Sequence, residues 1–201
     1  FCYIKGIMAT EVSICSNALR RLGDSPITSL SDDTERARLC NALYEPARDS
    51  LLRSHAFNFS ITRASLAKSA TTPAFEFANQ FILPTDPFCL RVLKMEFDDF
   101  KFKIENLAGE GRVLLTDEGT ANILYIAKIT DTTLFDAIFV DTLTAKLSAE
   151  LAYPVTNSVS LQTQMEKIYK LKLTEARSID STEGFIDDII SDTFTDFRKF
   201  S

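Results

Sequence analysis

The chain has 201 residues, of which 45% are hydrophobic, and it carries a formal net charge of −6. This length and apolar content suffice for one hydrophobic core with at most a small appended subdomain. The acidic balance argues against a protein that grips nucleic acid through its phosphates. The sequence contains no run of eighteen apolar residues, so we expect no membrane-spanning helix.

Neither the cysteines nor the first residues indicate a secreted protein. The cysteines lie far apart and form no C-x-x-C pair, so we interpret them as small buried hydrophobes in a reducing cytosol. Residues 1–7 lack the charged region and the small-residue cleavage site of a signal peptide. We interpret them as an extension ahead of Met8. The cysteines are Cys2, Cys15, Cys40 and Cys89.

A first amphipathic helix is predicted over residues 10–22. Thr10 is a suitable N-cap, and Gly23 follows the last apolar position as a helix-stopping glycine does. The buried face is predicted from the spacing of three residues, Ile14, Ala18 and Leu22.

A second helix is predicted over residues 32–55. Ser31 or Asp32 would cap it, and Glu35 stands three residues after Asp32, as a capping box requires. Pro46 lies inside the apolar pattern, so we expect a kink there. The buried face is predicted to contain Cys40, Tyr44, Ala47 and Leu51.

The middle of the chain, about residues 57–128, changes to short extended segments separated by prolines and glycines. Residues 57–68 alternate enough for a strand. Three further strands are predicted at about 101–106, 112–116 and 122–128, with glycine-containing turns between them. We expect these three to form an antiparallel meander.

Two more helices are predicted over residues 133–153 and 158–178. In the first, large apolar residues recur every four positions and form one stripe. Asp131 and Thr133 precede it as capping residues, Pro154 should end it, and Asn157 with Ser158 or Ser160 can cap its successor. The two apolar faces contain Phe135, Phe139, Leu143, Leu147 and Leu151, and then Leu161, Met165, Ile168, Tyr169 and Leu173.

Together these elements predict an α+β fold: a four-helix bundle-like core, an inserted antiparallel β-meander and an extended C-terminal arm. The predicted organisation is an extension at 1–7, one domain at 8–180 and the arm at 181–201.

The arm combines large apolar residues with aspartates, whereas a disordered tail is poor in aromatics. Burying four or five of these side chains contributes about 8–10 kcal/mol, and ordering the segment costs about 1–2 kcal/mol per residue. We therefore expect it to dock on another protein, although folding back on its own domain is an alternative. The predicted partner-binding residues are Phe185, Ile186, Ile189, Ile190, Phe194, Phe197, Arg198 and Phe200.

Several segments, in their order along the chain, resemble the head-to-tail adaptor family of short-tailed phages, also called tail tubular protein A or gatekeeper-like connectors. These are the A-L-x-x-L-G at 18–23, the P-I-x-S-L at 26–30, the N-F at 58–59, the L-A-Y-P at 151–154 and the D-x-F-x-x-x-R at 192–198. The chain departs from the family at Ala56-Phe57, where Pro-Trp is expected. Phe57 can fill the same aromatic role.

The resemblance implies a structural virion protein without catalytic activity, located in the neck or tail and in the host cytoplasm during assembly. It implies a ring of this chain, usually of twelve copies, beneath the portal protein, with a tail nozzle or tube attached below. Genomic DNA would pass through the lumen without specific binding, and an acidic subunit suits that task because it repels phosphate. No cofactor, metal or membrane is implied.

The arginines of the first two predicted helices suggest an alternative, a DNA-binding regulatory protein with a helix-turn-helix. The ten-residue connection is long for that motif, and acidic residues interleave with the arginines. We therefore predict ion pairs between subunits for Arg36, Arg38, Arg48 and Arg53.

A small hydrolase of the phage tail is a third possibility, which rests only on scattered carboxylates. A Ser-His-Asp or Cys-His site would have to use His55, the only histidine, and no motif surrounds it. The glycines at 109 and 111 are interpreted as a turn because the third glycine of a dinucleotide motif is missing. Asp187, Asp188, Asp192 and Asp196 match no calcium loop, so we interpret them as a solvated face or as partners for basic residues.

Overall fold

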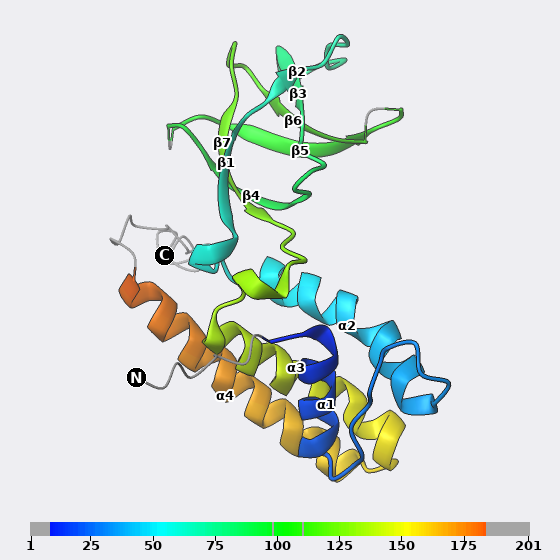
Figure 1. Cartoon of the computed structure of the whole chain (residues 1–201). Helices are drawn as coiled ribbons and strands as arrows, with labels where there is room; N and C mark the ends of the chain where they lie inside the picture. The colour runs from blue at the N-terminus through cyan, green and yellow to red at the C-terminus, as the bar shows by residue number, and fades with distance from the viewer. Residues whose placement is uncertain (1–8, 98, 110, 184–201) are drawn as a thin grey trace, which may run out of the picture.

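The computed structural model describes residues 9–97, 99–109 and 111–183. This part of the chain contains four α-helices and two antiparallel sheets, so the mixed α and β composition is confirmed. The helices lie together at one end of an elongated molecule and the strands at the other (Figure 1). The predicted arm from residue 184 onward and the extension at 1–7 fall outside the described residues.

Helix α1 (Glu11–Arg21) begins and ends as predicted. Thr10 accepts a hydrogen bond from the Ser13 amide, and the Ser13 side chain bonds back to Thr10 in a capping box. Gly23 adopts φ +78°, and its amide bonds to the Arg20 carbonyl while that of Asp24 bonds to Leu19. This is a Schellman motif, which requires the left-handed conformation that glycine adopts without strain.

Helix α2 (Glu35–Ser54) starts later than predicted, and the Asp32–Glu35 capping box is wrong. Thr34 is the N-cap and accepts from the Ala37 amide at 3.2 Å. The Asp32 carboxylate instead accepts from the amides of Thr28 and Ser29 and closes the preceding loop. The helix continues through Pro46. Its predicted buried face is confirmed, since Cys40, Tyr44, Ala47 and Leu51 are at most 1% exposed.

Helix α3 (Ala137–Thr156) and helix α4 (Val159–Glu183) also differ from their predicted bounds. Asp136 caps α3, whereas Asp131 caps the short 3-10 turn Thr132–Leu134 before it. The prediction that Pro154 ends the helix is wrong, since the helix runs on to Thr156. Proline removes its own N–H donor and crowds the carbonyl four residues earlier, and the exposed last turn of α3 accommodates both effects. The chain turns instead at Asn157, which has φ +52°.

Helix α4 begins at Ser158, whose hydroxyl accepts from the Leu161 amide at 3.2 Å. The helix runs five residues past the predicted end at 178, so residues 181–183, assigned to the arm, are helical.

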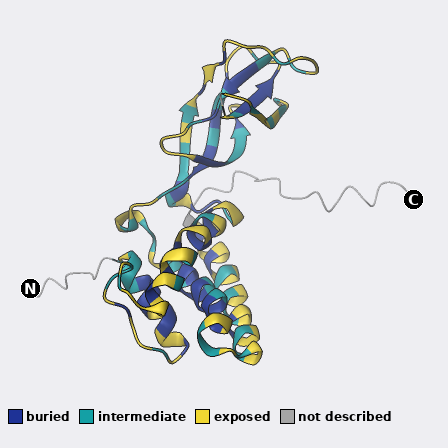
Figure 2. Cartoon of the chain, turned by 90° about the vertical axis from the view of Figure 1, so that its right-hand side faces the viewer, coloured by how far each residue is buried: buried dark blue, intermediate teal, exposed yellow. Residues whose placement is uncertain are grey.

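The core of the helical part surrounds α3, which contacts α1, α2 and α4. The predicted stripe is confirmed from Phe139 onward, and Phe139, Leu143, Leu147 and Leu151 are fully buried. Thr142, Thr144 and Ser148 are buried as well, so α3 is covered over much more than one stripe. One face stays partly exposed and carries Asp141, Lys146 and Glu150. Figure 2 shows the dark, buried positions concentrated between the helices.

The strands form two sheets, with the orders β1-β7-β4 and β2-β3-β6-β5. Their bounds are β1 Ile61–Ser65, β2 Ala67–Lys68, β3 Asn79–Ile82, β4 Cys89–Met95, β5 Phe102–Leu107, β6 Gly111–Thr116 and β7 Asn122–Ala127.

The predicted three-stranded meander is wrong, although its strands exist. β5 and β6 form the predicted hairpin, but β7 leaves it and pairs with β1 and β4. Strand β6 lies between β3 and β5, so both of its edges are already hydrogen-bonded. It is buried on both faces, with Val113, Leu114 and Leu115 at most 6% exposed. β7 therefore has no edge of β6 to pair with.

The two sheets share a second core. Leu66, between β1 and β2, carries the chain from one sheet to the other, and its amide donates to the Ala121 carbonyl at 2.8 Å. Ile123 and Tyr125 of β7 face the core between the sheets, whereas Ile126 of the same strand belongs to the helical core. Successive side chains of β7 point to opposite faces of its sheet, so one strand contributes to both cores and connects the helical and β parts.

Phe139 tests how strongly the helical core depends on one side chain. It contacts the rings of Phe57, Phe59 and Phe135 with centroids 4.9–5.0 Å apart. We expect Phe139→Ala to lower the free energy of unfolding by about 3–5 kcal/mol. Leu171→Ala, at a position 71% exposed, is the matched control and should cost less than about 0.5 kcal/mol. Urea denaturation followed by circular dichroism measures both, and equal losses would contradict the assignment of the core.

Candidate interaction site

The helical and β parts meet beside the C-terminal half of α2, where polar contacts connect four elements. Asp49 of α2 pairs with Lys128, just after β7, at 3.0 Å. Arg53, one turn further along α2, donates to the carbonyl of Leu90 in β4. Leu90 and Ile126 pack into the helical core at the same place. This junction fixes the β part on the helices through directional bonds as well as apolar contact.

His55 and Asp180 attach the last turns of α4 to the same junction. His55 is the C-cap of α2, and its Nε2 lies 2.9 Å from Oδ2 of Asp180. The other carboxylate oxygen accepts from the Asn58 amide at 3.0 Å, and the Asn58 side chain donates to the Asp180 carbonyl. Asp180 is only 7% exposed. All of its polar groups that point toward the junction therefore have partners within the chain.

The charge state of His55 follows from its surroundings. Burial lowers the pKa of His55 below its ordinary value, and the nearby Arg177 and Arg91 act in the same direction, while Asp180 only partly opposes them. The imidazole is thus neutral at pH 7. A carboxylate only accepts hydrogen bonds, so the proton of neutral His55 lies on Nε2. The contact positions the end of α4 against the C-terminus of α2.

Three arginines surround this contact. Arg53 is held at the Leu90 carbonyl, next to Arg91 in sequence, and Arg177 of α4 donates to the Ser54 carbonyl at 3.4 Å. Burial and the neighbouring Arg53 lower the pKa of Arg91. Among the described residues, none of these guanidinium groups has an ion pair with a carboxylate. The junction is therefore locally basic in a chain that is acidic as a whole.

The four arginines predicted at subunit interfaces have partners within the chain. Arg36 pairs with Asp24 at 2.6 Å and Arg38 with Asp33 at 2.9 Å, both on exposed surface. The Arg36 guanidinium lowers the pKa of Asp24. Arg53 lies at the junction. Whether these arginines also contact a second copy stays a prediction.

Arg48 differs from the other three because its side chain is 1% exposed. Its Nε donates to Asp49 at 2.9 Å, and its guanidinium lies 5.8 Å from the centre of the Tyr44 ring. Arg48 Nη2 and Tyr44 Oη are buried without a hydrogen-bond partner in the described part of the protein. Arg48 is therefore held inside the subunit, and a contact between Arg48 and a second copy stays a prediction.

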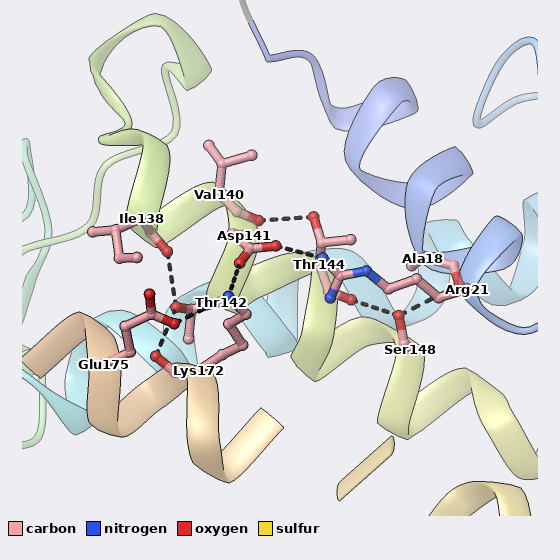
Figure 3. Close-up of polar contacts among 10 residues, drawn as sticks. All are labelled: Ala18, Arg21, Ile138, Val140, Asp141, Thr142, Thr144, Ser148, Lys172 and Glu175. Carbon is pink, nitrogen blue, oxygen red and sulfur yellow. Dashed lines mark hydrogen bonds and ion pairs between the residues drawn. The ribbon is translucent and has the colours of Figure 1, made fainter. Parts of the chain in front are cut away.

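Asp141 connects three helices on another face of the molecule (Figure 3). It pairs with Arg21 of α1 and, at 3.0 Å, with Lys172 of α4. Burial alone would raise the pKa of Asp141, but the bonds from Lys172 and Arg21 outweigh it and lower the pKa. Lys172 also pairs with Glu175. The network fixes the relative positions of α1, α3 and α4.

Buried hydroxyls of α3 support this arrangement. Thr144 and Ser148 donate to the carbonyls of Val140 and Thr144, four residues earlier, at 2.7 and 2.8 Å (Figure 3). The Ser148 hydroxyl also lies 3.4 Å from the Ala18 carbonyl of α1. A hydrogen bond from the hydroxyl to a carbonyl of its own helix satisfies the hydroxyl without a partner from another element. Small polar side chains can therefore sit where neighbouring helices approach closely.

The remaining predicted sites give different outcomes. Cys15, Cys40 and Cys89 are free and buried as predicted, and Cys2 lies outside the described residues. The hydrogen bond with the Cys40 thiol, together with burial, raises the pKa of the Cys15 thiol, so Cys15 stays protonated. All eight predicted partner-binding residues from Phe185 to Phe200 lie outside the described residues. Within the described ranges, no group of three or more histidine, cysteine or acidic side chains could hold a metal ion.

No model of a protein family matches the chain, and neither does any curated protein. Within residues 9–97, 99–109 and 111–183, no helix has the length and apolar character needed to cross a bilayer.

The junction itself was missed by sequence reasoning. His55 and Asp180 are separated by 125 positions, and their contact depends on how α4 packs. A usable signal was present in Asp180, an acidic residue placed on the apolar side of the last helical turns, where a buried carboxylate needs a partner.

His55 makes the stability of the protein dependent on pH near its ordinary pKa of 6.5. Because folding lowers that pKa, the unfolded chain binds the proton more readily than the folded chain. We expect the free energy of unfolding to fall as the pH is lowered from about 7.5 through this value, and to level off below the folded pKa. Urea denaturation at a series of pH values measures the effect. His55→Gln should flatten the profile, whereas stabilisation on acidification would mean that Asp180 dominates.

Asp141 provides a second test of stability. Its side chain is 34% exposed, so its two ion pairs are partly screened by solvent. We expect Asp141→Asn to lower the free energy of unfolding by about 0.5–1 kcal/mol, with coupling to Arg21→Gln in a double-mutant cycle. Asp33→Asn is the matched control, since Asp33 pairs with Arg38 but is 99% exposed. A control loss as large as that of Asp141→Asn would contradict the role of the network.

Proposed function

We propose that this chain is a structural head-to-tail adaptor of a short-tailed phage. In this proposal it forms a ring under the portal, extends the DNA channel and anchors the tail nozzle or tube. It acts without catalysis, cofactor or metal, in the virion neck and, during assembly, in the host cytoplasm. DNA passes through the lumen without specific binding.

One observation carries the proposal: segments that resemble the family from distant parts of the sequence converge on one core. Leu19 and Leu22 precede Gly23, Ile27 lies in the following loop, and Leu151 and Ala152 belong to α3. All five are buried in the same apolar cluster. Shared motifs that pack together support a shared fold, because each constrains the others.

The departure from the family at Ala56-Phe57 is accommodated by that core. Phe57 is 1% exposed and packs edge-on against Phe139, with ring centroids 5.0 Å apart. Phe59 contacts the same ring. The segment after α2 therefore supplies the aromatic anchor that the resemblance calls for.

The finer architecture belongs to the same proposal. The helices would form the bundle-like core of a ring subunit, the strands would be the inserted unit, and residues 184–201 the docking arm. Arg36, Arg38 and Arg53 would lie at subunit contacts, and for Arg36 and Arg38 the exchange of acidic partners between copies needs little rearrangement. A closed ring requires such head-to-tail contacts between identical subunits.

The DNA-binding alternative finds less support. Arg21, Arg36 and Arg38 of α1 and α2 already pair with Asp141, Asp24 and Asp33. A DNA-binding helix pair presents its cations to phosphates, whereas here carboxylates compete for each of them. A salt-dependent gel shift by the isolated chain would reverse this preference.

Assembly with a portal ring tests the proposal directly. The full chain is mixed with the portal of the phage that encodes it, and the complex is examined by native mass spectrometry and cryo-electron microscopy. We expect a ring of this chain beneath the portal. A chain that never enters a ring would overturn the proposal.

Deletion of residues 185–201 separates docking from folding in that assay. We expect the shortened chain to keep its circular dichroism spectrum and thermal transition but to bind the portal at least about tenfold more weakly, since a single buried phenylalanine contributes about 2 kcal/mol. If the shortened chain unfolds, the segment belongs to the core of the domain and the docking role fails.

A further inference from the structure

We propose that the acidic residues 184–197 dock in cis on a basic face of the same chain, formed by the outer surface of the β1-β7-β4 sheet and the adjoining end of α4. We call this surface the basic face and define it by Arg53, Arg63, Arg91 and Arg177. The proposal concerns the free chain, before the same segment docks on the portal as proposed above, and it does not depend on the adaptor function.

The lower end of the basic face is fixed by hydrogen bonds. Arg53 is held against β4 at the Leu90 carbonyl, and Arg177 reaches across to the Ser54 carbonyl at 3.4 Å. Arg91 follows Leu90 directly and lies opposite Ile126 in the sheet register. Three cations from α2, β4 and α4 therefore gather around the His55–Asp180 contact. The carboxylate oxygens of Asp180, at the centre of this group, are already bonded to His55 and Asn58.

The face continues upward along the sheet. Two residues further along β7, Leu124 lies opposite Arg63 of β1 and Lys94 of β4. Two residues of strand span about 7 Å, so this second row of basic residues lies one step from Arg91. These three residues line an open hollow of about 550 Å³ together with Glu96, whose carboxylate accepts from the Asn122 side chain at 2.8 Å. Leu124 is only half-buried, so the row offers an apolar contact between cations.

The arginines that define the basic face differ in their pairing from other arginines of α1 and α2. Among the described residues, Arg53, Arg63, Arg91 and Arg177 have no carboxylate within ion-pair distance. By contrast, Arg21, Arg36 and Arg38 all have one. Unpaired arginines gathered on one surface of an acidic protein attract an anionic ligand, and their planar groups suit carboxylates or phosphates.

The sequence supplies a matching acidic segment at the right place. Residues 184–197 contain Asp187, Asp188, Asp192 and Asp196 but no basic residue, and apolar side chains lie between the aspartates. The segment follows Glu183, six residues after Arg177 on the same helix. It is therefore tethered beside the basic face, and tethering raises its effective concentration to about the millimolar range. An extended chain of that length reaches up to about 45 Å, which covers both rows.

Phosphates of a nucleic acid have the same charge and are the competing ligand. They would have to approach a surface that already carries a covalently attached acidic segment. Because that segment is present at every protein concentration, the observations favour it over nucleic acid.

The test uses the full chain with Arg91→Lys and a zero-length carbodiimide, which joins a carboxylate to an amine in direct contact. The matched control is Arg20→Lys, in the last turn of α1, which ends away from the sheets (Figure 1). We expect amide links from Lys at position 91 to the aspartates of 187–196, at a yield at least roughly tenfold above the control. The links should decline in about 1 M salt, where charges are screened beyond about 3 Å. Arg63→Lys should give the same result for the upper row.

Three outcomes would overturn the proposal. The links could fail to exceed the control, they could join only light to heavy chains in an isotope-mixed sample, or a short DNA duplex could bind the face with an affinity lost in Arg91→Gln. The second would mean exchange between copies and the third a nucleic-acid site. A chain that forms these links but never enters a ring would leave this proposal intact while the adaptor function fails.

Discussion

The enclosure of α3 is the constraint on which the rest of the structure depends. A helix buried over most of its circumference needs cover from several directions, and here α1, α2 and α4 provide it. The N-terminal helices therefore have to return to a helix more than eighty positions away in sequence. Buried Thr144 and Ser148 remain compatible with this because each hydroxyl bonds to its own helix.

The polar contacts of the molecule are concentrated where elements from distant parts of the chain meet. Asp141 joins three helices, and Asp180 joins the end of α4 to the turn after α2. Each carboxylate has more than one hydrogen-bonding partner, and together these directional bonds fix the relative position of the elements more narrowly than a single apolar contact does. Apolar burial supplies most of the stability in such a fold, while these bonds select one relative placement of the parts.

Sequence periodicity predicted the helices and their buried faces because burial repeats locally, as it does at Leu143 and Leu147. It failed where local signals competed. Asp32 resembled a cap but closes a loop, and Pro154 resembled a stop but lies inside a helix. The pairing of β7 and the His55–Asp180 contact depend on long-range packing, which no local pattern records. The aspartates at 187–196 lie outside the described residues, so their predicted role as a solvated face or as partners for basic residues stays a prediction.

The β part enters and leaves the helical part at one place. Ile61 at its beginning is the register partner of Ile126 near its end. A unit whose first and last strands are neighbours closes on itself, so its interior can change in length or sequence without moving the attachment points. Such an architecture allows the distal sheet to diversify between related proteins, or to be exchanged by engineering, while the helical scaffold keeps its geometry.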